Sequence, residues 1–166
     1  MIRGDFYGDG LNNMKQELAS FVAIAHETTK CIELPYVRNQ PKSARLIPFS
    51  IVIDIEKTLE NIGSDIQVVQ RDKQSLFKVK FPEEFTMDKA KEIIDREKNV
   101  YLRTRTLWHA QAWAKTPMWH KFLDNCVLEE SLQKRVDATL KKVRKPFITV
   151  HARVEADWEN FCATRR

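Results

Sequence analysis

The sequence PFITVHARVEADWENFC, residues 146–162, is the stretch that decides the predicted fold. Its run 147–150 is short, apolar and β-branched, which is typical of a strand buried on both faces of a parallel sheet. The run is followed by His151, Arg153, Glu155 and Asp157, and Asp157 is a suitable cap for a following helix. Because ligands bind at the carboxyl ends of strands in open α/β sheets, the stretch predicts a central strand that leads into a binding site.

Arg153 has the most specific chemistry in this stretch. A planar guanidinium grips a phosphate or carboxylate with two parallel hydrogen bonds, whereas a lysine offers a point charge. The same side chain would also form an ordinary ion pair with Glu155 or Asp157 at the end of a strand. The residues alone leave the phosphate-binding and the structural interpretation open.

The other end of the chain predicts a first strand, a glycine loop and a helix. Three of the four glycines, Gly4, Gly8 and Gly10, lie in the first ten residues, and a short strand is expected around residues 5–7. Glycine lets the backbone approach a ligand, and a helix N-terminus presents N–H groups to it. Apolar residues at helical spacing predict a helix from Leu11 to about His26, with Asn12 and Asn13 in its first turn and Lys15, Gln16 and Glu17 on its polar face.

Both ends carry motifs of one known family. The pattern formed by His151, Arg153 and Asp157 resembles the His-x-Arg-x-x-x-Asp motif of the GDP-fucose protein O-fucosyltransferases, and Glu155 matches the acidic residue common in their plant-type branch. Residues 10–15, the helix after them and residues 32–35 are similar to the family's opening Gly-Gly-x-Asn-Gln loop, helix and second strand. Two motifs in this order are more specific than either alone, although the middle of the chain resembles the family only loosely.

The resemblance implies an inverting enzyme that transfers fucose from GDP-fucose to a protein hydroxyl. Arg153 would contact the β-phosphate as the sugar bond breaks, and Asn12 would lie beside the reacting centre, so these two are the expected catalytic residues. The expected substrate-binding residues are Gly10, Asn13, His151, Glu155 and Asp157. Asn13 stands where the family usually has glutamine, and Glu155 is the nearest candidate for a general base, although it would equally serve to hold Arg153. Nothing resembles an Asp-x-Asp site, so no obligatory metal or cofactor is expected.

The family is built from two Rossmann-like domains that face each other across a cleft, the GT-B arrangement. A chain of 166 residues is long enough for one well-packed α/β domain. We therefore expect residues 1–166 to form the N-terminal half, a three-layer domain with a mainly parallel sheet, without the C-terminal nucleotide-binding domain. The chain by itself is expected to be inactive or incomplete, and Asn12 and Arg153 are expected to lie within about 12 Å of each other at the carboxyl edge.

Charge and hydropathy bear on partners and location. The net charge of +5 would suit an anionic ligand, but part of it comes from residues 141–145, where cations complement the end of a predicted helix. The expected partners are GDP-fucose and an acceptor protein, with no nucleic acid and no membrane span. The resemblance implies the secretory pathway, although no targeting segment is recognised. The alternatives are a non-catalytic remnant that binds proteins or oligomerises, and a basic nucleic-acid-binding module.

The remaining elements follow from local patterns. Strands are expected at 31–36, at 66–69 as a buried strand, at 76–81 as a half-exposed edge or hairpin, and at 101–107. Helices are expected after Asp54 up to Gly63, over about 86–98, from Pro117, and over a segment with Leu132, Val136, Leu140 and Val143 on one face. A metal site from His109, His120 and Cys126 matches no recurrent zinc spacing. Cys31, Cys126 and Cys162 would form one disulfide with a leftover thiol, or three buried thiols.

Overall fold

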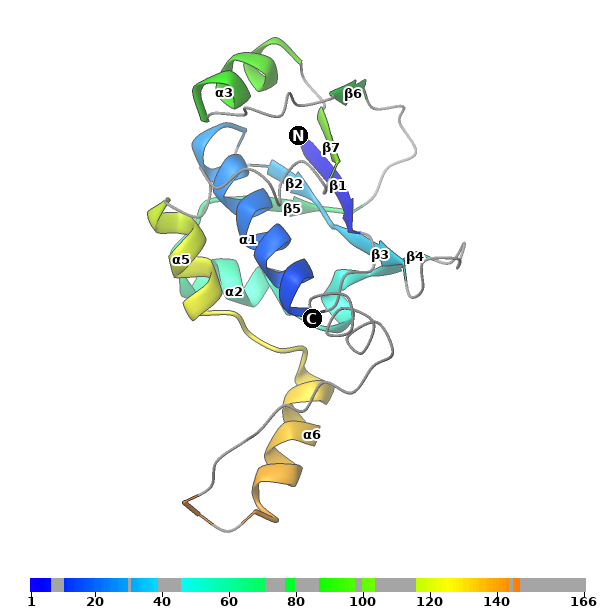
Figure 1. The fold of residues 1–166 in the computed structure, drawn as a ribbon, viewed down its shortest axis with the longest axis vertical. Coiled ribbons are helices and arrows are strands. Elements are labelled where there is room, and N and C mark those ends of the chain that lie inside the picture. Colours follow the sequence, from blue (N-terminus) through cyan, green and yellow to red (C-terminus); the bar gives the residue numbers. More distant parts are fainter. Residues whose placement is uncertain are drawn as a thin grey trace, which may run out of the picture. The chain divides into compact units, whose positions relative to one another are not determined.

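The computed structural model describes residues 1–6, 11–29, 31–38, 46–70, 77–79, 87–97, 100–103, 116–143 and 145–146. The chain divides into two compact units, Met1–Gln133 and Lys134–Arg166, and each is described by itself. The labelled elements of Figure 1 are β1 (Ile2–Phe6), α1 (Leu11–Glu27), β2 (Cys31–Glu33), β3 (Tyr36–Arg38), β4 (Leu46–Pro48), the 3-10 helix η1 (Phe49–Ile51), α2 (Ile55–Asn61), β5 (Gln67–Val69), β6 (Phe77–Val79), α3 (Met87–Arg96), β7 (Val100–Arg103), α5 (Pro117–Asp124) and α6 (Glu130–Leu140).

The first unit is an α/β structure with a mainly parallel sheet, as the sequence predicts. The parallel pairs run in the order β5, β2, β1, β7 and β6, and among the described strands β3 and β4 form the antiparallel pair. Strand β1 is therefore paired on both sides. Strands β2 and β3 lie along one side of it, and β7 lies along the other. The central position expected for 147–150 is occupied in the described sheet by β1, and 147–150 lie outside the described residues.

Several strand predictions need correction. The single strand expected at 31–36 is divided into β2 and β3, because Pro35 has no N–H for the ladder and its carbonyl instead accepts the Phe49 N–H at 2.9 Å. The strand expected to be buried at 66–69 is β5, which pairs only with β2 among the described strands and leaves Gln67 exposed. The hairpin alternative for 76–81 is wrong, because β6 pairs with β7 in parallel. The first strand begins at Ile2, before the expected residues 5–7.

Helix α1 forms the centre of the hydrophobic core. The prediction of a helix from Leu11 to about His26 is confirmed, and α1 packs on β1 and β2 on one side and against α5 on another (Figure 1). Every side chain from Leu18 to Ala25 is buried, and the core around it includes Ile2, Ile32 and Phe122. Glu17, expected on a solvent-facing side, is also buried. The adjacent turn of α1 is covered by α5, where the Trp119 Nε1–H donates to Ser20 Oγ at 3.2 Å.

The two short helices begin where the sequence predicts, and α2 also ends there. The Asp54 carboxylate caps α2 by accepting the Lys57 backbone N–H at 3.0 Å, and Gly63 beyond the helix has a φ of 62°, in the left-handed region that favours glycine. Thr116 caps α5, and Pro117 occupies its first turn. Cys126 lies beyond the end of α5 rather than within it. None of the helices in the described part of the chain is long and apolar enough to cross a bilayer.

Helix α6 is confirmed, but its apolar stripe does not enter a core. Val136, Leu140 and Val143 are each about two-fifths exposed, at 40%, 39% and 39%, and no residue of α6 is buried. Val143 lies beyond the end of the helix, in a turn whose backbone N–H bonds the Leu140 carbonyl at 3.2 Å. The helical periodicity therefore predicts the helix correctly, while its hydrophobic side remains open to solvent.

Candidate functional site

The candidate site is the carboxyl edge of the sheet where β1 leads into α1. The chain leaves β1 at Phe6 and enters α1 at Leu11, so the first turn of α1 lies beyond the carboxyl end of β1. That turn contains Asn12 and Asn13 and no acidic residue. The first-turn backbone N–H groups of a helix point beyond its end, and the helix dipole makes the position favourable for an anion.

The strand order places this edge at a change of direction in the sheet. From β1 the chain continues to β2 and β5 on one side, whereas β6 and β7 lie on the other side. In open α/β sheets, the crevice outside such a switch point is the preferred place for a ligand. In the described part of the sheet, the first turn of α1, which contains Asn12 and Asn13, therefore lies where such a sheet binds a ligand.

The structure places the predicted site residues unequally. Asn12 and Asn13 are both in the first turn of α1; Asn13 is half-buried, and the side chain of Asn12 is outside the described part of the chain. The remaining expected site residues also lie outside the described residues, namely Gly10, His151, Arg153, Glu155 and Asp157. The approach of Asn12 to Arg153 therefore stays a prediction.

Strand pairing brings two further arginines to the same edge. Arg103 ends β7 and is in register with Asp5 of β1. Arg38 ends β3, one position beyond the residue that pairs with Phe6. Neither arginine stands out in the sequence, because the parallel pairing that gathers them at one edge is not visible in a single sequence. Two arginines at this edge are consistent with an anionic ligand.

A buried ion pair lies in the same strands and was also missed. Arg3 of β1 donates from Nη2 to Glu33 Oε2 of β2, and the Glu33 side chain is only 1% exposed. The register pairs Ile2 with Ile32, so Arg3 and Glu33 are the next residues along adjacent strands and project to the same face. Because Glu33 is enclosed and bound to Arg3, its carboxylate holds β1 and β2 together and is inaccessible to a ligand.

The suggested metal ligands do not gather in the part that is described. His120 is exposed on α5, Cys126 is half-buried after it, and His109 is outside the described residues. No group of three potential ligands occurs among the residues searched. Burial raises the pKa of the Cys126 thiol to about 11, and the nearby Lys15 ammonium lowers it by a smaller amount. Cys31 and Cys126 are both free thiols, so the alternative with a disulfide is wrong for this pair.

Trp119 contacts the hydrophobic core. Its ring packs against the buried cluster, and its indole N–H bonds Ser20 as described above. The His120 ring stands edge-on to it, with centroids 4.9 Å apart and an interplanar angle of 84°. The hydrogen bond from Trp119 to Ser20 joins α5 to α1 and so helps to position the helix whose first turn forms the candidate site.

Comparison with protein-family models, with curated proteins and with solved structures found no match to this chain. The resemblance to the fucosyltransferases thus rests on the two terminal motifs.

Proposed function

We propose that this chain contributes the N-terminal, Rossmann-like half of a GT-B type O-fucosyltransferase, which transfers fucose from GDP-fucose to a protein hydroxyl in the secretory pathway. The observation that carries the proposal is the position of Asn12 and Asn13 in the first turn of α1, at the carboxyl edge beside the switch between β1 and β7. This is where an α/β sheet binds its ligand. The motif around Arg153 supports the same assignment through its resemblance to the family.

The proposed chemistry depends on the departing GDP phosphate. As the bond to fucose breaks, negative charge develops on the β-phosphate, and fixed donors stabilise that charge more than the ground state. Arg153 supplies a bidentate guanidinium for this charge, and Asn12 positions the sugar or the acceptor hydroxyl. Gly10 allows the backbone to approach the donor, while His151, Asn13, Glu155 and Asp157 hold Arg153 or the substrate.

The test is the substitution Arg153→Lys in the full-length protein, assayed by GDP release from GDP-fucose. The lysine keeps the positive charge but loses the fork, so we expect kcat to fall on the order of 100-fold to 1,000-fold with little change in the melting temperature. Arg96→Lys is the matched control, since Arg96 is an exposed residue of α3 that pairs with Glu92 at 3.4 Å on the same helix.

Two results would contradict the proposal. Normal turnover with a lowered melting temperature would assign Arg153 to a structural ion pair. Failure of the unmodified full-length protein to release GDP from GDP-fucose, while it folds cooperatively, would favour the non-catalytic alternative.

A further inference from the structure

The positive charge of this protein is concentrated in one short segment. Residues 134–145 contain six basic residues and one acidic residue, Asp137, which gives the segment a net charge of +5. The whole chain also carries a net charge of +5, so the remainder is neutral overall. A charge localised in this way creates a field around the end of α6 and not around the protein as a whole.

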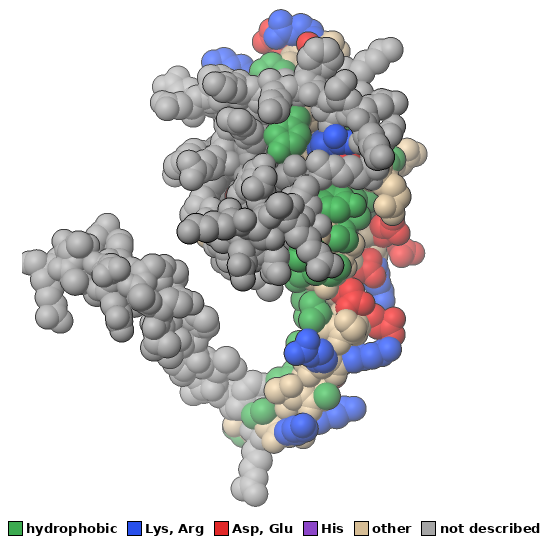
Figure 2. Space-filling model, turned by 90° about the vertical axis from the view of Figure 1, so that its right-hand side faces the viewer, with side chains coloured by type: hydrophobic (Ala, Val, Ile, Leu, Met, Phe, Trp, Pro, Cys, Tyr) green, Lys and Arg blue, Asp and Glu red, His purple; other side chains and the backbone are tan. Residues whose placement is uncertain are grey.

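The same segment presents apolar side chains to solvent. Val136 and Leu140 are four residues apart on α6 and therefore share a face, and both are exposed together with Val143. By helical geometry, Lys134 falls on the opposite face, and Lys141, the residue after Leu140, lies to one side of this stripe. Figure 2 shows that cationic and hydrophobic side chains both reach the surface of the segment that contains α6.

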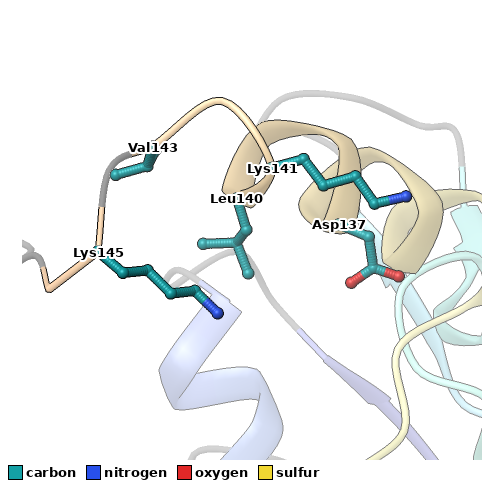
Figure 3. A pocket seen from close by; sticks show the side chains of 5 residues that line it. All are labelled: Asp137, Leu140, Lys141, Val143 and Lys145. Carbon is teal, nitrogen blue, oxygen red and sulfur yellow. The ribbon is translucent and has the colours of Figure 1, made fainter.

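An open pocket combines both kinds of side chain. It has a volume of about 520 Å³ and is lined by Asp137, Leu140, Lys141, Val143 and Lys145. Figure 3 shows the Leu140 and Lys145 side chains extending into the same space, below Val143, while Lys141 and Asp137 lie along the helix. The ligand that suits such a lining has an anionic group for the ammonium ions and an aliphatic part for Leu140 and Val143.

We propose that residues 134–145 dock this protein on a bilayer that contains anionic phospholipids, with the phosphate groups near Lys141 and Lys145 and the upper acyl region against Leu140 and Val143. A helix with a cationic face and an exposed aliphatic stripe lies in the plane of such a surface. Each Lys or Arg near an anionic bilayer strengthens the association about fivefold, so the charge supplies most of the binding. The docking requires no GDP-fucose and is independent of the proposed enzymatic function.

Other occupants fit the segment less well. A second copy would bring two segments of charge +5 together, which is repulsive. A nucleic acid would satisfy the lysines and leave the stripe of Val136, Leu140 and Val143 in water. Docking into a groove of a partner protein relies on anchor side chains that are well packed and commonly aromatic. The exposed large apolar residues described in this segment are instead the aliphatic Val136, Leu140 and Val143.

The test is co-sedimentation of the full chain with vesicles of phosphatidylcholine alone and with vesicles that contain about 30% phosphatidylserine, at about 0.1 M salt. We expect binding to the anionic vesicles and little to the neutral ones. The double variant Lys141→Gln/Lys145→Gln should reduce the partition coefficient roughly 30-fold, at about fivefold for each lysine. Leu140→Ser should reduce it by about fivefold, because its aliphatic area no longer leaves water.

The matched control is Lys57→Gln/Lys121→Gln, which removes the same charge from exposed residues of α2 and α5. We expect this control to change binding less than twofold. An equal loss in the control and the test variant would overturn the proposal, because net charge would then be sufficient. Unchanged binding by Leu140→Ser, equal binding to neutral vesicles, or binding to single-stranded DNA or polyglutamate without binding to anionic vesicles would each overturn it as well.

Discussion

Replacing Glu33 with glutamine should destabilise the protein more than any exposed charge substitution. The change keeps the shape of the side chain but removes the Glu33 carboxylate from the Arg3 guanidinium, whose side chain is 10% exposed. Removing one member of a buried ion pair typically costs about 3–5 kcal/mol, because the remaining charge stays desolvated. That is a large part of the roughly 5–15 kcal/mol by which domains are stable.

Urea unfolding followed by circular dichroism measures this effect. With an m-value of about 2 kcal/mol per molar urea, the expected loss moves the midpoint down by about 1.5–2.5 M. The control is Glu92→Gln, which breaks an exposed pair with Arg96 within α3. Exposed pairs at this spacing contribute about 0.3–0.5 kcal/mol, so the control should shift the midpoint by less than about 0.3 M.

A double variant distinguishes the effect of the two charges on stability from the effect of the volume that the two side chains occupy. Arg3→Met/Glu33→Leu removes both charges together and keeps most of the buried volume, and such replacements are often neutral or stabilising. We expect its stability to be at least that of Glu33→Gln and close to the unmodified protein. If Glu33→Gln costs no more than Glu92→Gln, the ion pair does not hold β1 and β2 together and the reasoning is refuted.

Three other substitutions or conditions test the packing and the local structure. Phe122→Ala should cost about 3–5 kcal/mol in urea unfolding, because the ring is completely buried between α5 and α1, and a cost below about 1 kcal/mol would contradict that packing. Asp54→Ala should cost about 0.5–2 kcal/mol through loss of the α2 cap, and Asp54→Asn should recover most of it. The Cys126 thiol, with its pKa raised from 9.0 to about 11, should react with iodoacetamide about 100-fold more slowly at pH 8 in the folded than in the unfolded protein, as measured by peptide mass spectrometry. Since the thiol ionises at lower pH in the unfolded protein, its contribution to stability is complete below pH 9.0 and is lost as the pH rises through 11. Equal alkylation rates in the folded and unfolded protein would show that burial does not control the ionisation of the Cys126 thiol.

The sequence alone determined the elements whose causes are local. The spacing of apolar residues defines α1, because a period of 3.6 residues places them on one face whatever the rest of the chain does. Asp54 and Gly63 define the limits of α2 through a capping hydrogen bond and a left-handed backbone conformation, both formed within a few residues. The general class, an α/β structure with mainly parallel strands, also follows from the succession of these local patterns.

Part of the candidate site was likewise accessible to sequence reasoning. The glycines and the helix that follows them predict a first turn at the carboxyl edge of the first strand, and the structure places Asn12 and Asn13 there. The role of Arg153 depends on the resemblance alone, since no local pattern distinguishes a phosphate ligand from an ion-pair partner.

Only the tertiary structure decided which surfaces and strands meet. The ion pair of Arg3 with Glu33, and the gathering of Arg38 and Arg103 at one edge, depend on pairing between strands that are distant in sequence. Glu17 follows the polar spacing of α1 and is nevertheless buried, because the packing of α5 covers the neighbouring turn. In contrast, the stripe at Val136 and Leu140 has the spacing of a core face and stays exposed. Periodicity specifies that one face of a helix is apolar, but burial depends on whether another part of the chain packs against it.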